Sequence, residues 1–304
     1  FGEVGERSST GLAMMLGQPD IDCVSILLPV CVQLEVVEMA LNAGKHVFSE
    51  KPLSPDFETG RDMVERYEAL YLPRGLCWSI GENYRYEPAF DKAAQLVATL
   101  GTLSLCELRV HSPMPKDNPY YSTPWRKEPQ FQGGYLLDGG CHFIAALRKV
   151  CGGCSDVHEV RSILGSFAPH LPSPDTVVGA LRFGNGLLAT TAISFAVTSR
   201  LFELSVTGMG GQVTVTRGVK EGRHGYEVVS SIVANGGKEE REFFPFEGVD
   251  RELQAFASAV ATNSPEFYSP REALRDVEVI CNLIKSSTTG EKEILSPWPP
   301  AAQF

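Results

Sequence analysis

CVSILLPVCVQLEVVEMALNAGKHVFSEKP, residues 23–52, places an amphipathic segment between two short apolar runs. The first run, residues 23–28, is typical of a parallel strand that is buried on both faces. In residues 32–42 apolar side chains recur at the spacing of a helix. The second run, residues 46–48, predicts a strand that ends before Pro52, because proline lacks the N–H that a strand ladder needs. The stretch therefore predicts a β-α-β unit.

The alternation of strand and helix continues beyond this stretch. Ser54 and Pro55 are a suitable N-cap and first residue for a helix that runs to about residue 71, and residues 76–80 predict a third strand. Such alternation is typical of a doubly wound parallel sheet, which binds ligands beyond the carboxyl ends of its strands. Pro29 and Glu50-Lys51-Pro52 follow two of these strands. We therefore expect a ligand site there.

The chain from residue 86 onward has the pattern of a second, α+β unit. A helix predicted at 88–100 precedes several strands, and glycine-rich turns at 183–187 and 208–211 favour antiparallel pairing. The predicted strands are 105–110, 177–183, 187–196, 202–207 and 213–217. Helices at 250–262 and 270–286 complete the unit. The predicted fold is thus the remainder of a Rossmann-type parallel sheet in residues 1–82, followed by an α+β domain with a mostly antiparallel sheet in residues 83–304.

The composition is that of an ordinary globular protein. The 304 residues are 43% hydrophobic and 21% charged, and the net charge of −10 disfavours nucleic-acid binding. We expect no membrane span and no secretory signal, and we predict a cytoplasmic protein. Cys151-Gly-Gly-Cys154 is open to two interpretations, a redox or zinc half-site and a plain glycine turn. Because no second cysteine pair or histidine cluster completes a metal site, no metal is predicted.

Three short stretches carry the chemistry, and together they identify a family. They are Pro29 with Gln33, Glu50-Lys51-Pro52, and GGYLLDGGCH at residues 133–142. In this order they resemble the glucose-fructose oxidoreductase and inositol dehydrogenase family (Gfo/Idh/MocA). In that family an Ala-Gly-Lys-His-Val…Glu-Lys-Pro element closes the dinucleotide-binding domain, and an Asp-x-Gly-x-His element faces it from the substrate domain. Residues 43–52 and 138–142 match these elements.

The resemblance implies an NAD(P)-dependent oxidoreductase that transfers a hydride to or from a sugar, a polyol or a related hydroxylated small molecule. Lys51, Asp138 and His142 are the predicted catalytic residues. If a helix begins at Asp138, its carboxylate and the imidazole of His142 share one face, so that Asp138 can orient His142 as the base. Lys51 is a compact cation whose pKa can fall on burial, and it can stabilise charge on the substrate oxygen.

The remaining candidate residues surround these three. Residues at the strand ends and one arginine are predicted to bind the cofactor: Leu28, Pro29, Gln33, Glu50, Lys51 and Arg126. Planar donors and aromatic platforms suit hydroxylated substrates, and those predicted to line the sugar pocket are Asn83, Arg85, Tyr121, Trp125 and Arg126. Two positions depart from the family pattern. Gln33 stands where many relatives have histidine, and Ala145 where an aspartate often follows, which leaves the substrate and the reaction subtype open.

No Gly-x-Gly-x-x-Gly occurs before Cys23. Because the family begins with such a phosphate-binding turn inside a β-α-β unit, we expect an N-terminally truncated member whose binding of NAD or NADP is weak. This leaves two alternatives to a dehydrogenase, a non-catalytic interaction or sensor protein and an NAD-assisted glycoside hydrolase. Because helices are predicted on only one face of the antiparallel sheet, a homodimer or homotetramer that associates through the other face is also expected.

Overall fold

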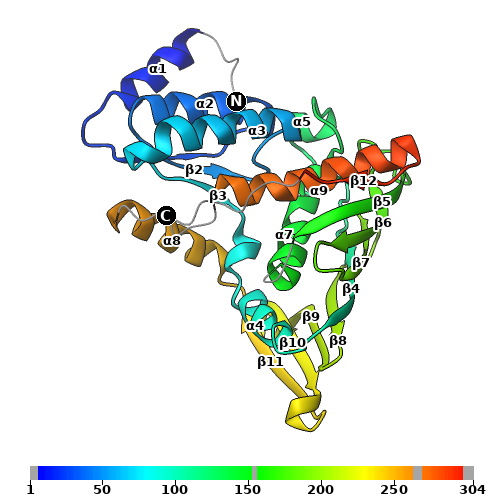
Figure 1. Cartoon of the computed structure of the whole chain (residues 1–304). Coiled ribbons are helices and arrows are strands. Elements are labelled where there is room, and N and C mark those ends of the chain that lie inside the picture. Colours follow the sequence, from blue (N-terminus) through cyan, green and yellow to red (C-terminus); the bar gives the residue numbers. More distant parts are fainter. Residues whose placement is uncertain (1–5, 153–155, 263–268, 297–304) are drawn as a thin grey trace.

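The computed structural model describes residues 6–152, 156–262 and 269–296, which form a small parallel sheet and a larger mixed sheet (Figure 1). The first part contains α1 (Glu6–Leu16), β1 (Cys23–Ile26), α2 (Val30–Asn42), β2 (His46–Glu50), α3 (Phe57–Arg66), a π-helical turn (Tyr67–Tyr71), a 3-10 turn (Leu72–Arg74) and β3 (Trp78–Gly81). Its strands pair in parallel in the order β1-β2-β3. The predicted β-α-β unit and third strand are therefore confirmed.

Two expectations for this part are wrong. Helix α3 begins at Phe57 and its N-cap is Asp56, whose carboxylate accepts the N–H of Thr59 at 2.8 Å. The Ser54 hydroxyl instead donates to the backbone oxygen of Asp56, so it cannot cap the helix. Strand β1 is also less buried than predicted. Within the described residues it pairs with β2 alone, and the side chains of Cys23 and Ser25 are exposed.

The second part is built on a nine-stranded sheet in the order β11-β10-β9-β8-β4-β7-β6-β5-β12. Only β4 and β7 pair in parallel, so the sheet is mostly antiparallel, as predicted. Its strands are β4 (Leu103–His111), β5 (Val157–Gly165), β6 (Thr176–Phe183), β7 (Leu188–Ser194), β8 (Leu201–Gly208), β9 (Gly211–Lys220), β10 (Arg223–Ile232), β11 (Glu239–Pro245) and β12 (Glu293–Ile294).

Helices cover one face of this sheet (Figure 1). They are α4 (Pro88–Val97), α7 (Gly140–Cys151) and α9 (Pro270–Thr289), and a 3-10 turn, η3 (Asn83–Tyr86), leads into α4. The short helices α5 (Pro124–Lys127) and α6 (Tyr135–Asp138) precede α7, and α8 (Gly248–Thr262) packs against η3 and β3. Alternate residues of β6 face the helices: Val177 and Leu181 are buried, whereas Val178 is 56% exposed. No helix in the described part of the chain is long and apolar enough to cross a membrane.

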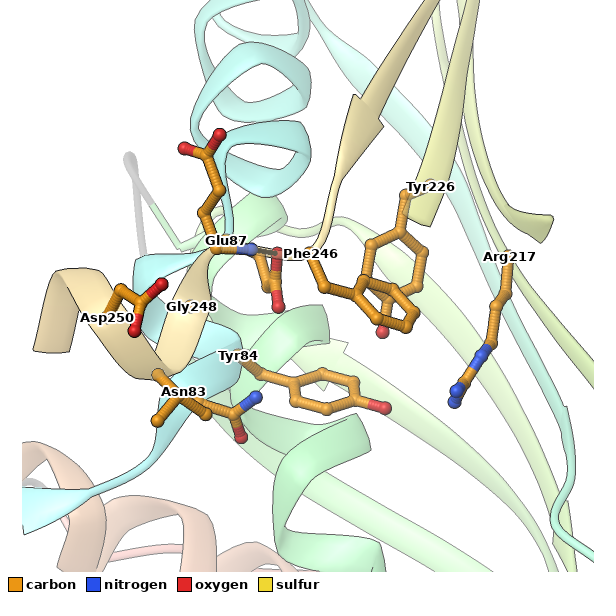
Figure 2. A pocket seen from close by; sticks show the side chains of 10 residues that line it. Asn83, Tyr84, Glu87, Arg217, Tyr226, Phe246, Gly248 and Asp250 are labelled. Carbon is orange, nitrogen blue, oxygen red and sulfur yellow. Dashed lines mark hydrogen bonds between the residues drawn. The ribbon is translucent and has the colours of Figure 1, made fainter. Parts of the chain in front are cut away.

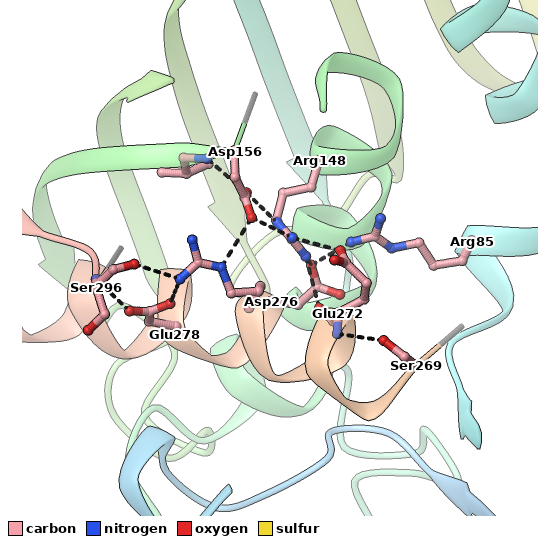
Figure 3. A network of polar contacts seen from close by, with 10 residues as sticks. Arg85, Arg148, Asp156, Ser269, Glu272, Asp276, Glu278 and Ser296 are labelled. Carbon is pink, nitrogen blue, oxygen red and sulfur yellow. Dashed lines mark hydrogen bonds and ion pairs between the residues drawn. The ribbon is translucent and has the colours of Figure 1, made fainter. Parts of the chain in front are cut away.

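The two sheets are joined through α9 and a network of buried charges. Helix α9 contacts both α3 and β5, and a Cβ at Gly60 of α3 would lie 2.7 Å from Leu274 Cδ1, so only glycine allows this approach. Arg148 of α7 lies at the centre of the network (Figure 3). Its guanidinium contacts three carboxylates, those of Asp156, Glu272 and Asp276 at 2.6–2.9 Å. The ion pairs hold α7 and α9 together beneath the sheet.

Candidate active site

The turn after β2 is supported from beneath by α2. The Gln33 amide donates to the backbone oxygens of Glu50 at 2.7 Å and Pro52 at 3.2 Å, and the side chain is only 1% exposed. The Glu50 carboxylate in turn accepts the N–H of Lys51 at 3.1 Å. These bonds direct the Lys51 side chain away from the first sheet. Gln33, a predicted cofactor residue, thus positions the Lys51 turn, and its role toward the cofactor stays a prediction.

Lys51 crosses to the second part of the molecule and binds Asp138. Its ammonium group donates to Asp138 Oδ1 at 3.0 Å and to the Asp138 backbone oxygen at 2.6 Å. The second carboxylate oxygen of Asp138 accepts from Arg126 Nε at 2.7 Å. The carboxylate is buried and held between two cations. Lys51, Asp138 and Arg126 therefore form one ion-pair cluster, made of two predicted catalytic residues and one predicted cofactor residue.

The charges in this cluster fix each other's protonation states. Burial alone would raise the pKa of Asp138, but Lys51 and Arg126 outweigh it and lower the pKa to about 2. Burial alone would lower the pKa of Lys51, but the charge of Asp138 outweighs it and raises the pKa above its ordinary value. The expected fall of the Lys51 pKa is therefore wrong. Lys51 is a permanent cation at neutral pH.

His142 is oriented by Glu82 and not, as predicted, by Asp138. His142 Nδ1 lies 2.6 Å from Glu82 Oε1. Helix α6 ends at Asp138, and α7 begins only after Gly139, so Asp138 and His142 do not share one face of a continuous helix. Tyr84 stacks on the imidazole with ring centroids 4.9 Å apart. The imidazole is thus held at one edge by a carboxylate and on one face by a tyrosine.

Sequence reasoning missed Glu82, although a signal for it exists. Glu82 directly follows β3, at the carboxyl edge of the parallel sheet where Lys51 follows β2. Its side chain is 3% exposed. Burial opposes ionisation, but the neighbouring His142 and Lys51 lower the pKa of Glu82 below its ordinary value. A buried, ionised carboxylate is therefore available to accept a hydrogen bond from His142 Nδ1–H.

The carboxyl edge of the first sheet is suited to a dinucleotide cofactor. The ends of β1, β2 and β3 bring Leu28-Pro29, Glu50-Lys51 and Glu82 to one edge, which is the ligand-binding edge of parallel sheets. Helix α2 begins at this edge with no acidic residue in its first turn and no side-chain cap, so its positive end is open to an anionic group. Together with the Lys51 cation, these features fit a nicotinamide dinucleotide.

Apart from Arg126, which belongs to the Asp138 cluster, the four other predicted substrate residues are dispersed. Asn83 lines a pocket between η3 and the sheet (Figure 2), whereas Arg85 donates to Asp276 at 2.9 Å in the buried network (Figure 3). The Lys127 ammonium lies over the Tyr121 ring, and the Arg126 guanidinium lies 4.0 Å from the centre of the Trp125 ring. Trp125 is therefore brought to the Asp138 cluster through Arg126. The substrate roles of all four stay predictions.

One group of side chains has the spacing of metal ligands. Donor atoms of Glu82, Cys141 and His142 lie within 4.8 Å of one another. Burial raises the pKa of the Cys141 thiol well above its ordinary value, so the thiolate that binds metals is disfavoured. The adjacent Lys51 cation also opposes a metal ion. Of the pair Cys151 and Cys154, the second residue lies outside the described residues, and Cys151 Sγ lies 3.5 Å from Cys106 Sγ.

The half-buried Lys51 follows β2 at the carboxyl edge of the parallel sheet, and Glu82, after β3, holds His142 of α7 at the same edge. Beside a second, mixed sheet, this arrangement defines a class of two-domain, nicotinamide-dependent oxidoreductases. Family comparison gives the particular family. The model of the oxidoreductase family, NAD-binding Rossmann fold, matches residues 3–71, and that of the GFO/IDH/MocA C-terminal domain matches residues 90–214. The chain belongs to the Gfo/Idh/MocA family of oxidoreductases. The resemblance noted from the sequence is thereby confirmed.

Individual relatives are similar over most of their length. Dehydrogenase FPY6 of Fusarium mangiferae is 33% identical over 287 residues, which cover 92% of this chain and 79% of the relative. D-xylose 1-dehydrogenase (NADP(+)) 2 of Haloferax volcanii is 25% identical over 284 residues, with coverages of 91% and 81%. The crystal structure of an oxidoreductase from Thermotoga maritima superposes with a TM-score of 0.78 at 28% identity, covering 97% of this chain and 82% of that one.

Proposed function

We propose that this protein transfers a hydride between a nicotinamide cofactor and a hydroxylated small molecule of the sugar or polyol class, with Lys51 and His142 at the reacting centre. The observation that carries the proposal is the junction of two clusters. The Lys51–Asp138 ion pair and the Glu82–His142 pair share a neighbour in Cys141, whose thiol donates to the same backbone oxygen of Asp138 that Lys51 contacts. Both groups needed to handle a carbinol proton thus lie together.

In the proposed mechanism Lys51 supplies the positive charge that stabilises the substrate oxygen. Oxidation of a carbinol would break its C–H bond, and the hydride acceptor would be supplied by a nicotinamide held at the carboxyl edge of the first sheet, where Lys51 and the start of α2 lie. The substrate oxygen gains negative character as its proton leaves, and a fixed cation that hydrogen-bonds this oxygen stabilises the charge. Lys51 remains protonated because Asp138 holds it, and Arg126 holds Asp138. The ion pair therefore keeps the charge and the direction of the lysine constant through the reaction.

His142 is the proton acceptor in this scheme. Because Glu82 is ionised, it accepts a hydrogen bond from His142 Nδ1–H, and this selects the tautomer that has its lone pair on Nε2. Nε2 then takes the hydroxyl proton, and the ionised Glu82 stabilises the imidazolium that results. In the reverse direction the same atom returns the proton. Glu82 thus positions the histidine and does not itself contact the reacting atoms.

The assignment of substrate class is supported by relatives. The relative from Haloferax volcanii is by name a D-xylose 1-dehydrogenase that uses NADP(+), which fits a polar, hydroxyl-rich substrate. The choice between NAD and NADP belongs to the same proposal and is open to direct measurement. An NAD-assisted glycoside hydrolase would release free sugar with no net change in the nicotinamide, and a non-catalytic sensor would bind without turnover.

The test is a titration followed by turnover. NADH and NADPH are titrated separately into the purified protein by nicotinamide fluorescence, and the tighter-binding cofactor is then incubated in its oxidised form with a panel of aldoses and polyols. We expect reduction of the nicotinamide with at least one sugar, and a loss of about 100-fold or more in kcat for Lys51→Met and for His142→Asn. Lys292→Met and His158→Asn change exposed residues of the same types and serve as controls.

Two outcomes would contradict this proposal. One is cofactor binding without reduction by any member of the panel. The other is turnover that survives in Lys51→Met and His142→Asn at the level of the two control variants. Release of free sugar from a glycoside with no net change in the concentration of reduced nicotinamide would show that the protein is an NAD-assisted glycoside hydrolase and not a dehydrogenase.

A further inference from the structure

The pocket that Asn83 lines lies next to the catalytic cluster, but Lys51, Asp138 and His142 do not line it. It has a volume of about 290 Å³ and lies between η3, the strands β9 and β10, and the beginning of α8 (Figure 2). Three aromatic side chains, Tyr84, Tyr226 and Phe246, form much of its wall. The volume is close to the lower end of ligand pockets in proteins. The cavity is therefore large enough for a small organic molecule.

The cavity has a cationic end. Arg217 projects from β9, and its guanidinium lies 4.8 Å from the centre of the Phe246 ring, a contact that holds the side chain in place. Among the described residues Arg217 makes no recorded ion pair with any carboxylate. In Figure 2 the Tyr84 hydroxyl points toward Arg217. A guanidinium held beside tyrosine hydroxyls is a suitable site for a carboxylate.

The opposite end of the cavity is acidic. Asp250 lies on the first turn of α8, and in Figure 2 it stands on the side away from Arg217. Glu247, just before α8, also lines the cavity. The side chains of both residues have no recorded ion pair within the described part of the chain. Glu87 is different, because its carboxylate accepts the N–H of Glu247 at 3.2 Å and so belongs to the helix start.

We propose that this cavity binds a small zwitterion, with its carboxylate at Arg217 and its ammonium group at Glu247 and Asp250. The charge pattern selects against the simpler ligands. A polyanion would be repelled by the acidic end, and a plain cation would leave Arg217 without a partner and lie in its field. A molecule with both charges satisfies both ends, while its aliphatic part lies against the aromatic wall. Binding in this cavity does not require that the redox reaction proposed above takes place.

Tyr84 connects the cavity to the catalytic histidine. One part of Tyr84 forms the cavity wall, and its ring stacks on His142 with an interplanar angle of 19°. A ligand that contacts the Tyr84 hydroxyl therefore displaces a side chain whose ring also positions the His142 imidazole. Binding in the cavity should consequently alter kcat more than it alters the affinity for cofactor.

The test is calorimetric titration of the full chain, without cofactor, using glycine, β-alanine, γ-aminobutyrate and δ-aminovalerate. Valerate and pentylamine are the matched single-charge probes. We expect at least one zwitterion to bind about tenfold or more tightly than either of them, because each charged end adds one charge-assisted contact. Arg217→Gln and Asp250→Asn should each weaken that zwitterion by about tenfold. Arg109→Gln, on the sheet outside the cavity, should bind as the unchanged protein does.

Circular dichroism and thermal melting of each variant establish that it is folded. If Arg217→Gln does not fold, Asp250→Asn and the single-charge probes still decide the matter. The proposal is overturned if no zwitterion binds more tightly than valerate or pentylamine, or if folded Arg217→Gln or Asp250→Asn keeps the unchanged affinity.

Discussion

Asp138 and Glu82 are two buried carboxylates with separate tasks at the candidate site. Within the described residues the Asp138 carboxylate pairs with two cations, Lys51 and Arg126, whereas the Glu82 carboxylate binds the imidazole of His142. This division matters because one carboxylate cannot both neutralise the lysine and fix the histidine tautomer. Two residues from different elements, one after β3 and one at the end of α6, supply the two functions.

Glu82→Gln tests the positioning role at the residue scale. The amide keeps the shape but loses the charge that fixes the Nδ1–H tautomer and stabilises the imidazolium, so we expect kcat to fall by about 100- to 1000-fold. Cofactor affinity should stay unchanged, and Glu82→Asp should recover part of kcat. Steady-state kinetics and NADH titration measure both quantities. Unchanged kcat in a folded Glu82→Gln protein would show that Glu82 has no part in catalysis.

The lowered pKa of Asp138 predicts that the free energy of unfolding depends on pH. Its pKa is about 2 in the folded protein, against an ordinary value of 3.8, so the folded state favours the ionised form. The stabilisation is present above about pH 4 and is lost as the pH falls toward 2, with a size of about 2 kcal/mol. Urea denaturation should find Asp138→Asn less stable than the unchanged protein at neutral pH, with a difference that narrows below pH 4. A difference independent of pH would contradict this assignment.

At the scale of elements, α8 places a buried carboxylic acid, that of Glu252, near the candidate site. Glu252 is 6% exposed, and its Oε2 has no hydrogen-bond partner within the described residues. Burial, followed by the negative charges of Glu82, Glu50 and Glu87, raises the pKa of Glu252 to about 9. Since α8 packs against η3 and β3, this neutral acid lies where three other carboxylates converge.

Glu252→Gln should therefore stabilise the protein in a pH-dependent way. Between pH 4.5, the ordinary pKa, and about 9 the folded state keeps a proton that the unfolded state releases, so stability falls as the pH rises through this window. The slope is at most about 1.4 kcal/mol for each pH unit. The free energy of unfolding of Glu252→Gln does not fall in this way. In chemical denaturation the variant should therefore exceed the unchanged protein in stability by an amount that grows from pH 5 toward 9. Glu221→Gln, in an exposed turn, is the control and should show no such trend.

The elements that sequence analysis predicted are those whose apolar pattern is local. Strand β6 alternates buried and exposed residues and is recognisable from eight residues alone. The prediction from sequence omits strands β5, β10, β11 and β12. In the edge strand β11 residues 239–242 are charged and exposed, so no apolar alternation marks its first half. The residues that pair at the candidate site lie far apart in the sequence. Lys51 and Asp138 are 87 positions apart, and Glu82 and His142 are 60 positions apart. The motifs therefore indicated Lys51, Asp138 and His142 but not which carboxylate contacts the lysine and which contacts the histidine.

At the scale of the whole molecule, the site depends on how firmly the two sheets are held together. Lys51 belongs to the first sheet and Asp138 to the second part, so any relative movement changes the distance between them. The Arg148 network lies behind this junction and also contains Arg85 through Asp276. Its Arg148–Asp276 pair is buried, with side chains 4% and 3% exposed, so the loss of either member leaves an uncompensated charge and destabilises a protein by about 3–5 kcal/mol. The network is thus a structural support for the active site.

The open face of the large sheet leads to a prediction about assembly. Ile163 and Val178 lie opposite each other on β5 and β6 and are 77% and 56% exposed, and Leu105 lies opposite Leu188 on β4 and β7. Two cross-strand apolar pairs on one uncovered face are typical of a protein interface. We therefore expect this face to join two copies of the chain, as a dimer or as half of a tetramer.

Val178→Glu should separate the copies, because a two-fold interface brings the new carboxylate near its symmetry mate and near apolar residues. Val233→Glu changes an equally exposed valine, 67% accessible, on a 3-10 turn away from this face, and it is the control. Sedimentation velocity should show a dimer or larger for the unchanged and control proteins and a monomer for Val178→Glu. A monomer in all three would exclude association through the sheet. An oligomer in all three would place the contact on another surface, since a buried glutamate pair would not be tolerated at the one predicted.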